Sequence, residues 1–288
     1  MTDLSRRNFL YGAAGTFAAG TLMHSFPSYA AALHNLPIGI QLYSVRELLD
    51  KNFEETLRLV AGAGYREVEA AGYYGRTPAA FSRALQNAGL RCVSTHHPLP
   101  YLLRKTDETI AFAAVLKMDY LVCSSSTRKD LTEGGPLSLD DWKWVADQLN
   151  ILGKKVKAAG MQFGYHNHIA EFTRFSKTVA YDELLRLTDP SLVKMEMDCG
   201  WVVAAGFDPV DYLQKSPDRF PLLHVKDMVR GTNGDFHSTE LGRGTIDYRP
   251  IFKAATGLRH YFVEQEEFDI PIPEALKVDA GFVRNLNP

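Results

Sequence analysis

From residue 37 onward, the chain repeats one pattern of short apolar runs, polar loops and segments with apolar residues three to four positions apart. Short apolar runs between turn residues are typical of buried strands, and the longer spacing is typical of amphipathic helices. In the first run, PIGIQLY, a period of two places Gln41 and Tyr43 on one face. The runs predict eight strands, at residues 37–43, 66–70, 90–95, 119–123, 161–164, 192–198, 222–225 and 261–264.

The segments between the strands carry helix start and stop signals. Thr77-Pro78 and Asp208-Pro209 each combine an N-cap residue with a proline at the first helical position. The third helix is predicted at residues 107–116 and the last at residues 273–283. Eight strand-helix units in about 250 residues predict an α/β fold, a (β/α)₈ TIM barrel over residues 33–288. A doubly wound sheet is the alternative, but no glycine-rich fingerprint follows the first strand.

Residues 1–32 differ from the rest of the chain. Ser5-Arg6-Arg7 precedes an apolar segment rich in Gly and Ala over residues 11–23, and small residues spaced as in a signal peptidase site follow. This arrangement resembles a twin-arginine signal peptide. We therefore predict export by the twin-arginine machinery and a periplasmic or secreted location, with an amphipathic first helix as the alternative.

Composition and charge narrow the class of protein. Of the 288 residues, 45% are hydrophobic and 23% are charged, as in ordinary globular proteins. The formal net charge is −2, so no basic field favours a nucleic acid partner. Cys92, Cys123 and Cys199 are too few for a disulfide framework, and we interpret them as buried thiols.

Ionisable residues gather where the predicted strands end, which is the functional face of a TIM barrel. Residues at the ends of strands five to eight could surround one point, where mixed histidine and carboxylate ligands suit a divalent ion. Glu196 alternates with Asp198, and we interpret it as part of an ion pair inside the barrel with Lys194. The strand-end residues are Glu69, His96, His166, His168, Glu171, Asp198, His224, Lys226, Glu264 and Glu266.

Several of these residues lie in segments that carry a resemblance to a known family. The segments are Tyr165-His166-Asn167-His168, Asp198-Cys199-Gly200-Trp201, His224-Val225-Lys226-Asp227, Leu241-Gly242-Arg243-Gly244 and Val263-Glu264-Gln265. With them, nearly all of residues 33–288 resembles the sugar phosphate isomerase/epimerase superfamily, the xylose isomerase-like barrels. That superfamily includes tagatose epimerases, hydroxypyruvate isomerase, inosose dehydratase and endonuclease IV.

The resemblance implies a set of metal ligands. Epimerases of the superfamily hold the metal with Glu, Asp, His and Glu from strands five to eight. Asp198, His224 and Glu264 match the last three positions, and His166 stands nearest the place of the first glutamate, with His168 as the alternative. We expect a divalent ion, with Mn²⁺ first and Zn²⁺, Co²⁺ or Mg²⁺ as alternatives.

The resemblance also implies proton abstraction from the carbon next to a carbonyl group. A divalent ion that grips the carbonyl oxygen stabilises an enediolate, and a nearby carboxylate or imidazole takes the proton. The candidate catalytic residues are Glu264, His168, Lys226 and Glu266. The candidate substrate-binding residues, some of them aromatic residues that could form a wall for a sugar ring, are Tyr43, Glu69, His96, Tyr165, Glu171 and Trp201.

Three functions follow as hypotheses. The first is a metal-dependent isomerase or epimerase for a sugar or keto-sugar. The second is a lyase or dehydratase acting on keto-sugars or 3-keto-glycosides, which the histidine on strand five and the predicted export favour. The third is a non-catalytic periplasmic sugar-binding barrel. We expect no nucleic acid partner, and the sequence leaves a homo-oligomer open.

Overall fold

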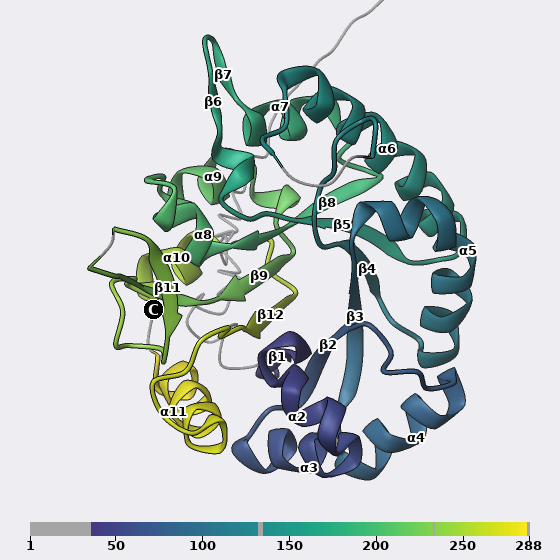
Figure 1. Cartoon of the computed structure of the whole chain (residues 1–288), viewed down its shortest axis with the longest axis vertical. Helices are drawn as coiled ribbons and strands as arrows, with labels where there is room; N and C mark the ends of the chain where they lie inside the picture. Colours follow the sequence, from purple (N-terminus) through teal and green to yellow (C-terminus); the bar gives the residue numbers. More distant parts are fainter. Residues whose placement is uncertain (1–35, 132–134, 233, 287–288) are drawn as a thin grey trace, which may run out of the picture.

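Eight parallel strands close into a barrel, in the order β1-β12-β9-β8-β5-β4-β3-β2 (Figure 1). The computed structural model describes residues 36–131, 135–232 and 234–286. The predicted TIM barrel is therefore confirmed. The barrel strands are β1 (Gly39–Gln41), β2 (Glu67–Ala71), β3 (Arg91–His97), β4 (Tyr120–Cys123), β5 (Gln162–His166), β8 (Val193–Asp198), β9 (Leu222–Val225) and β12 (His260–Val263).

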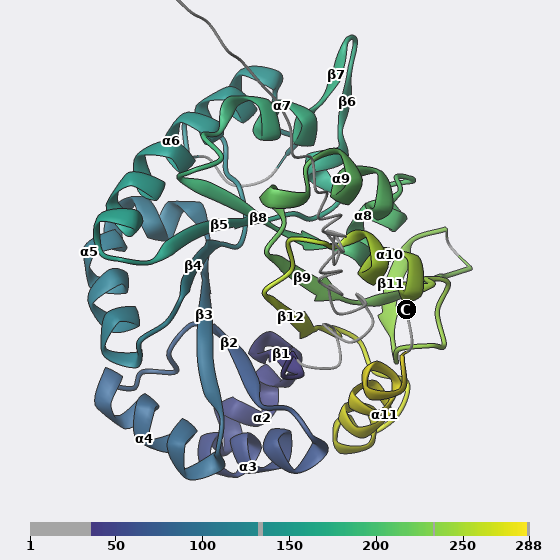
Figure 2. The same ribbon diagram turned by 180° about the vertical axis from the view of Figure 1, so that it is seen from behind.

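Helices cover the outside of the barrel, and α3 to α6 form an arc around strands β2 to β5 (Figures 1 and 2). The predicted caps form: Thr77 accepts a hydrogen bond from the backbone N–H of Ala80, and Asp208 accepts one from Val210. The helices are α2 (Arg46–Lys51), α3 (Phe53–Ala63), α4 (Pro78–Ala88), α5 (Leu99–Leu116), α6 (Leu139–Ala158), α7 (Ala180–Leu187), α8 (Cys199–Ala204), α9 (Pro209–Lys215), α10 (Tyr248–Ala254) and α11 (Ile272–Asn285).

Three local predictions need correction. The first strand ends at Gln41, because its side chain accepts the backbone N–H of Tyr43 and caps a 3₁₀-helix, Leu42–Val45. Gln41 therefore points into the barrel while Tyr43 is 43% exposed, so the two do not share a face. Helix α5 begins at Leu99, eight residues earlier than predicted, because prolines are tolerated in a first helical turn.

Two small hairpins interrupt the repeat of strand and helix. The first joins β6 (Arg174–Phe175) to β7 (Thr178–Val179) and projects from the body in Figure 1. The second joins β10 (Asp227–Arg230) to β11 (Phe236–Thr239) directly after β9. Neither hairpin was predicted, because both are too short to show a period-two pattern clearly. Both lie in loops that follow the carboxyl ends of barrel strands.

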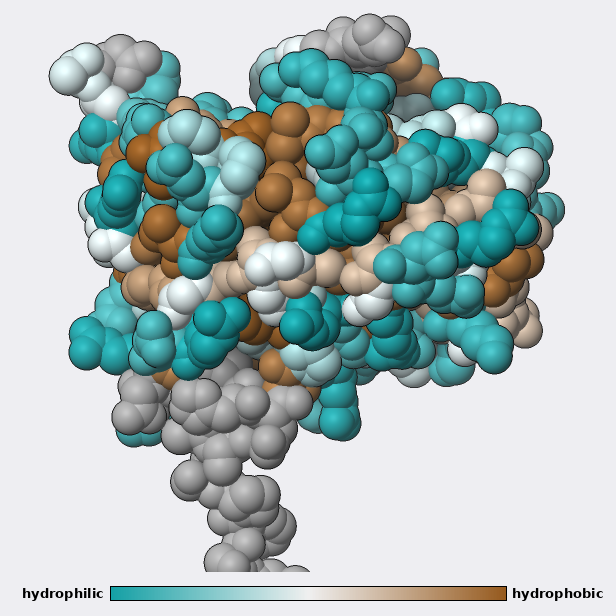
Figure 3. All heavy atoms as spheres, turned by 90° about the horizontal axis from the view of Figure 1, so that it is seen from below, coloured by the Kyte–Doolittle hydropathy of each residue, from teal (hydrophilic) through white to brown (hydrophobic). Residues whose placement is uncertain are grey.

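The inside of the barrel is apolar below its polar end. Val93, Val122, Leu222 and Phe262 are fully buried and form a cluster of their own, separate from the main core. Alternate residues of a strand share a face, so Leu222 underlies His224 in β9. The face seen in Figure 3 carries hydrophobic residues over its middle and mostly hydrophilic residues toward its rim. The polar groups at the carboxyl end of the barrel strands therefore lie against a buried apolar layer.

Close packing at the seam between β1 and β12 depends on a glycine. A Cβ atom at Gly39 would lie 2.5 Å from the backbone oxygen of Tyr261 and 2.6 Å from a ring carbon of Phe262. Real Cβ atoms do not approach other atoms so closely. The absence of a side chain at this position therefore allows the first and last strands to meet and close the barrel.

The predicted export signal falls on residues 1–32, which lie outside the described residues, so it stays a prediction. Across the part of the chain that the structure describes, no helix has the length and apolar character needed to span a membrane.

Candidate functional site

A cavity of about 410 Å³ opens at the carboxyl ends of the strands, as expected for this fold. Histidines and glutamates line it together with small residues and one tyrosine. The residues that line it are Tyr43, Ala71, Gly72, His96, His97, Pro98, Ser124, Ser125, His166, His168, Glu264 and Glu266.

Two overlapping groups of side chains at the base of this cavity could each hold a metal ion. The first ligand set is His166, Asp198, His224 and Glu264, and the second ligand set is His96, His166, Glu196 and His224. Within each set, the ligand atoms lie within 4.8 Å of one another. The register explains the first set, because Asp198 on β8 pairs directly with His224 on β9. The structure thus brings together the four residues that the sequence predicted as ligands.

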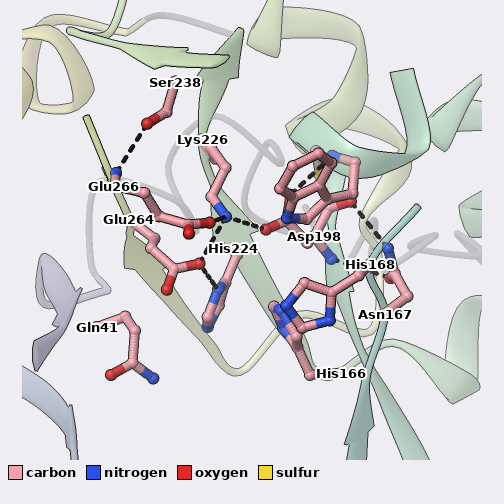
Figure 4. Close-up of polar contacts among 12 residues, drawn as sticks. Gln41, His166, Asn167, His168, Asp198, His224, Lys226, Ser238, Glu264 and Glu266 are labelled. Carbon is pink, nitrogen blue, oxygen red and sulfur yellow. Dashed lines mark hydrogen bonds and ion pairs between the residues drawn. The ribbon is translucent and has the colours of Figure 1, made fainter. Parts of the chain in front are cut away.

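Lys226 lies between three carboxylates beside the first ligand set (Figure 4). Its ammonium nitrogen is 2.9 Å from Asp198 Oδ2, 2.9 Å from Glu264 Oε2 and 2.6 Å from Glu266 Oε1. The side chain is 1% exposed, so it is no surface lysine. Burial lowers the pKa of Lys226, but the three facing carboxylates outweigh this effect and raise the pKa well above its usual value.

A second polar layer lies around Glu69 and Glu196, both fully buried. Glu196 Oε2 lies 2.5 Å from His96 Nε2 and 3.3 Å from His224 Nε2. The predicted partner of Glu196 is wrong: Lys194 donates to the backbone oxygen of Asp218, and Glu196 faces histidines. This carboxylate belongs to the second ligand set, a role that its alternation with Asp198 alone could not show.

The surroundings shift the pKa values of the buried histidines in different directions. Burial lowers the pKa of His96, yet Glu69 and Glu196 outweigh it and raise this pKa to about 9. Burial likewise lowers the pKa of His224, but Glu196 and Glu264 raise it well above its usual value. His166 is different, because burial and the neighbouring histidines both lower its pKa. An imidazole that stays neutral is the form that binds a metal ion.

The donor set fits a divalent cation. His166 Nδ1 has no hydrogen-bond partner in the described part of the chain, although it is buried. Asp198, Glu264 and Glu266 face Lys226, and Glu264 also faces His224, so three carboxylates share two basic side chains. Buried charges are costly unless they are paired or bind a metal. Mixed imidazole and carboxylate ligands suit Mn²⁺ and similar ions.

The loop after β5 is held by Glu171. Its Oε1 accepts a hydrogen bond from the Tyr165 hydroxyl at 2.5 Å, and its Oε2 accepts the backbone N–H of His168 at 2.8 Å. Asn167 joins this loop to β8 by exchanging hydrogen bonds with the backbone of Asp198. The His168 ring therefore stays beside that of His166, at 4.8 Å between centroids. Burial lowers the pKa of His168, which favours its neutral form.

Only some of the predicted substrate-binding residues line the cavity. Tyr43 and His96 line the cavity. Tyr165 and Glu171 do not, because they are buried against each other, and their predicted contact with substrate is corrected. Glu69 is buried below the cavity rather than in its wall. Trp201 also lies outside the wall, with its ring 5.2 Å from the ammonium of Lys226.

Of the predicted catalytic residues, Glu264, His168 and Glu266 line the cavity, and Lys226 lies just behind the two glutamates. Gln41 was not predicted, although its side chain reaches Glu69. The signal that could have found it is its place at the end of a barrel strand.

His97 lies on β3, and we expect its protonation in acid to lower the free energy of unfolding of the protein. Its ring stacks on Tyr101, and burial, followed by His96, lowers the pKa of His97 to about 4. Because the pKa of His97 is lower in the folded state, the neutral His97 contributes fully to the free energy of unfolding above the unfolded pKa, near 6.5. This contribution is lost as pH falls toward 4. We expect this residue to remove about 2 kcal/mol of unfolding free energy between pH 7 and pH 5.

The measurement is urea unfolding of wild type and of a His97→Gln variant across this pH range. The variant should lose less stability on acidification than wild type does. His237→Gln, on the β10–β11 hairpin, is the control and should follow wild type. Equal acid sensitivity in wild type and the His97 variant would contradict the prediction.

Comparisons with known proteins agree with this geometry. Residues 57–286 match the family model described as xylose isomerase-like TIM barrel. A solved structure called a sugar phosphate isomerase/epimerase, from Parabacteroides distasonis, is 30% identical, with a TM-score of 0.74 over 86% of this chain and 98% of that one.

Curated relatives are similar over most of their length. A protein named inosose dehydratase from Lacticaseibacillus casei is 26% identical over 76% of this chain and 83% of its own. Another of that name, from Clostridium tetani, is 28% identical over 70% of this chain and 77% of its own. With the family model matching 230 consecutive positions around the candidate site, residues 57–286, the chain belongs to the xylose isomerase-like TIM barrel family.

Proposed function

We propose that the protein is a divalent-metal-dependent lyase that removes water, or another β-substituent, from a keto-sugar or keto-polyol. The observation that carries the proposal is that carboxylates and imidazoles line the same cavity from the ends of different strands. Glu264 and Glu266 line it from the end of β12, while His166 and His168 line it from the end of β5. An imidazole and a carboxylate paired with an ammonium group, lining one cavity, can act as base and acid in the same reaction.

Elimination needs one group to take a proton and another to deliver one. We assign the first role to His168, whose pKa is lowered by burial, so that its imidazole is neutral and can accept a proton. We assign the second role to the pair of Lys226 and Glu266. The Lys226 ammonium carries the proton and donates a hydrogen bond to Glu266 Oε1 at 2.6 Å. The C–H bond next to the carbonyl breaks with its proton passing to His168. The electron pair of that bond forms a C=C bond as the C–O bond at the next carbon breaks, and the leaving hydroxyl takes a proton from the Lys226 ammonium and departs as water.

The residues that would hold the metal are His166, Asp198, His224 and Glu264, the first ligand set. A divalent ion bound there would polarise the carbonyl oxygen and stabilise the negative charge that develops on it. The relatives named inosose dehydratase support elimination from a cyclic keto-polyol.

The cavity also favours an uncharged substrate. Among the described residues that line it, none is lysine or arginine, whereas two are glutamates. Phosphate groups are usually bound by arginine, lysine or helix N-termini. We therefore propose a substrate without a phosphate group.

Isomerisation or epimerisation is the second candidate, supported by the 30% identical structure called a sugar phosphate isomerase/epimerase. It shares the first step with elimination and differs in the fate of the proton. The change from glutamate to His166 at the strand-five position weighs against it, because the epimerases of the family use that carboxylate for proton exchange.

The test is to incubate the Mn²⁺-loaded protein with a keto-inositol and a 3-keto-glycoside in D₂O and to follow the products by mass spectrometry. Loss of one water or of the aglycone is expected. Deuterium uptake without any loss would overturn the lyase in favour of the isomerase. Binding without either change would favour a sugar-binding barrel. His168→Gln should abolish elimination while keeping the metal, and His237→Gln should leave elimination unchanged.

A further inference from the structure

The β10–β11 hairpin continues directly from Lys226, which the strand β10 follows in the chain. The backbone of Lys226 is fixed by the Tyr248 hydroxyl, which accepts its N–H at 2.7 Å and donates to its carbonyl oxygen at 2.8 Å. Two residues further on, Met228 pairs with Ser238 on β11. The register of the hairpin therefore fixes the position of Ser238 relative to Lys226.

The side chain of Ser238 holds the turn that follows β12. Its hydroxyl oxygen accepts the backbone N–H of Glu266 at 2.8 Å and that of Glu267 at 3.0 Å (Figure 4 shows the first of these). The same hydroxyl donates to Glu267 Oε2 at 2.5 Å, and the backbone N–H of Ser238 donates to that oxygen at 2.9 Å. A hydroxyl group offers one donor and two acceptor positions, so these contacts use all of them.

This turn carries the carboxylate of Glu266 to the wall of the cavity. Glu266 Oε1 accepts a hydrogen bond from the Lys226 ammonium at 2.6 Å. The Glu266 side chain is 27% exposed, and a partly exposed glutamate loses conformational entropy when it is held in one rotamer. Ser238 itself is 3% exposed, so it restrains the backbone of this glutamate from a buried position.

We propose that Ser238 is a positioning residue that holds the turn after β12 so that the Glu266 carboxylate stays against the Lys226 ammonium in the cavity. The hairpin fixes both partners, because β10 continues from Lys226 and β11 carries Ser238. This inference rests on the proposed function, in which that pair delivers a proton to the leaving hydroxyl. Ser238 belongs neither to the residues that line the cavity nor to the first ligand set, so it acts through Glu266.

The experiment compares Mn²⁺-loaded wild type with Ser238→Ala, Ser238→Thr and Thr239→Val, on the keto-inositol or 3-keto-glycoside that wild type converts. Alanine removes the hydroxyl that holds the turn, so kcat should fall about 10- to 100-fold while KM and Mn²⁺ content stay close to those of wild type. Threonine keeps a hydroxyl group and should restore most of the loss. Thr239→Val is the matched control: it removes a buried hydroxyl of the same strand that faces Asp269 at 3.3 Å, and it should leave kcat unchanged.

Crystal structures of wild type and Ser238→Ala give a measurement that does not depend on activity. The contact between Glu266 Oε1 and Lys226 Nζ should be present in wild type and lost in the variant. If Ser238→Ala does not fold, Glu267→Ala takes its place, because it removes the acceptor of the serine hydroxyl at an exposed position and should lower kcat and loosen the same contact.

Retention of the contact between Glu266 and Lys226 in the variant would overturn the role of Ser238. An unchanged kcat, or an equal loss in Ser238→Thr and Ser238→Ala, would overturn it as well. A wild type that removes neither water nor an aglycone would overturn the proposed function instead, and the two crystal structures would then decide the role of Ser238 by themselves.

Discussion

A Glu264→Gln variant should lose its divalent ion and nearly all of its activity. Two contacts and a place in the cavity wall put Glu264, a predicted ligand, at the centre of the site. Its carboxylate is 2.8 Å from His224 Nδ1 and 2.9 Å from the ammonium of Lys226, and the residue lines the cavity. The amide keeps the shape of the side chain but removes the negative charge that a hard divalent cation needs.

The expected loss is large because the metal would carry much of the charge stabilisation. Several kcal/mol of stabilisation at the carbonyl oxygen corresponds to a decrease of about a thousandfold in kcat/KM. Metal content of the purified variant, determined by elemental analysis, is the direct measurement. Glu108→Gln, which makes the same change on the exposed face of α5, should retain both metal and activity. Full metal content in the Glu264 variant would contradict the assignment of this ligand.

A Lys226→Met variant should be strongly destabilised when no metal is bound. Methionine has a similar length but no charge, so Asp198, Glu264 and Glu266 would face one another without a cation. Breaking a buried ion pair by removing one partner costs about 3–5 kcal/mol, because the remaining charge is left uncompensated. Burial of Lys226 and its three short contacts place it in this category rather than among surface ion pairs.

A divalent ion should restore part of this loss, because it would neutralise the same carboxylates. Adding Mn²⁺ is therefore expected to raise the free energy of unfolding more in Lys226→Met than in wild type. Denaturant unfolding with and without Mn²⁺ measures both effects. Lys143→Met is the control: Lys143 pairs with Asp140 on the surface, and its loss should cost less than about 1 kcal/mol. A Lys226 variant as stable as wild type without metal would show that the ammonium does not balance these carboxylates.

Sequence periodicity was sufficient to predict the barrel because each strand and helix is specified by local signals. β9 occupies residues 222–225 as predicted, and α3 ends at Ala63 with Gly64 as its C-cap, whose φ of 116° suits only glycine. The errors fall where a side chain overrides the local pattern. Gln41 caps the segment that follows it and ends β1 early. The short hairpins, such as β6–β7, contain too few residues for any period to appear.

The sequence by itself determined which chemical groups reach the functional end of the barrel, since strand ends and residue types are local properties. The first ligand set was predicted in this way from the strand ends and the family resemblance. Only the tertiary structure decided which groups meet. His96 and Glu196 are 100 positions apart, and Glu69 and His224 are 155 apart, yet each pair is in direct contact.

The same holds for burial, which no local pattern reveals. Lys226 could have been a surface residue, and Tyr165 could have faced a sugar, as far as the sequence goes. Closure of the barrel buries the lysine among carboxylates and turns the tyrosine toward Glu171. Hydrogen bonds and ion pairs depend on distances of a few ångströms between remote segments, and these distances exist only once the eight strands have closed.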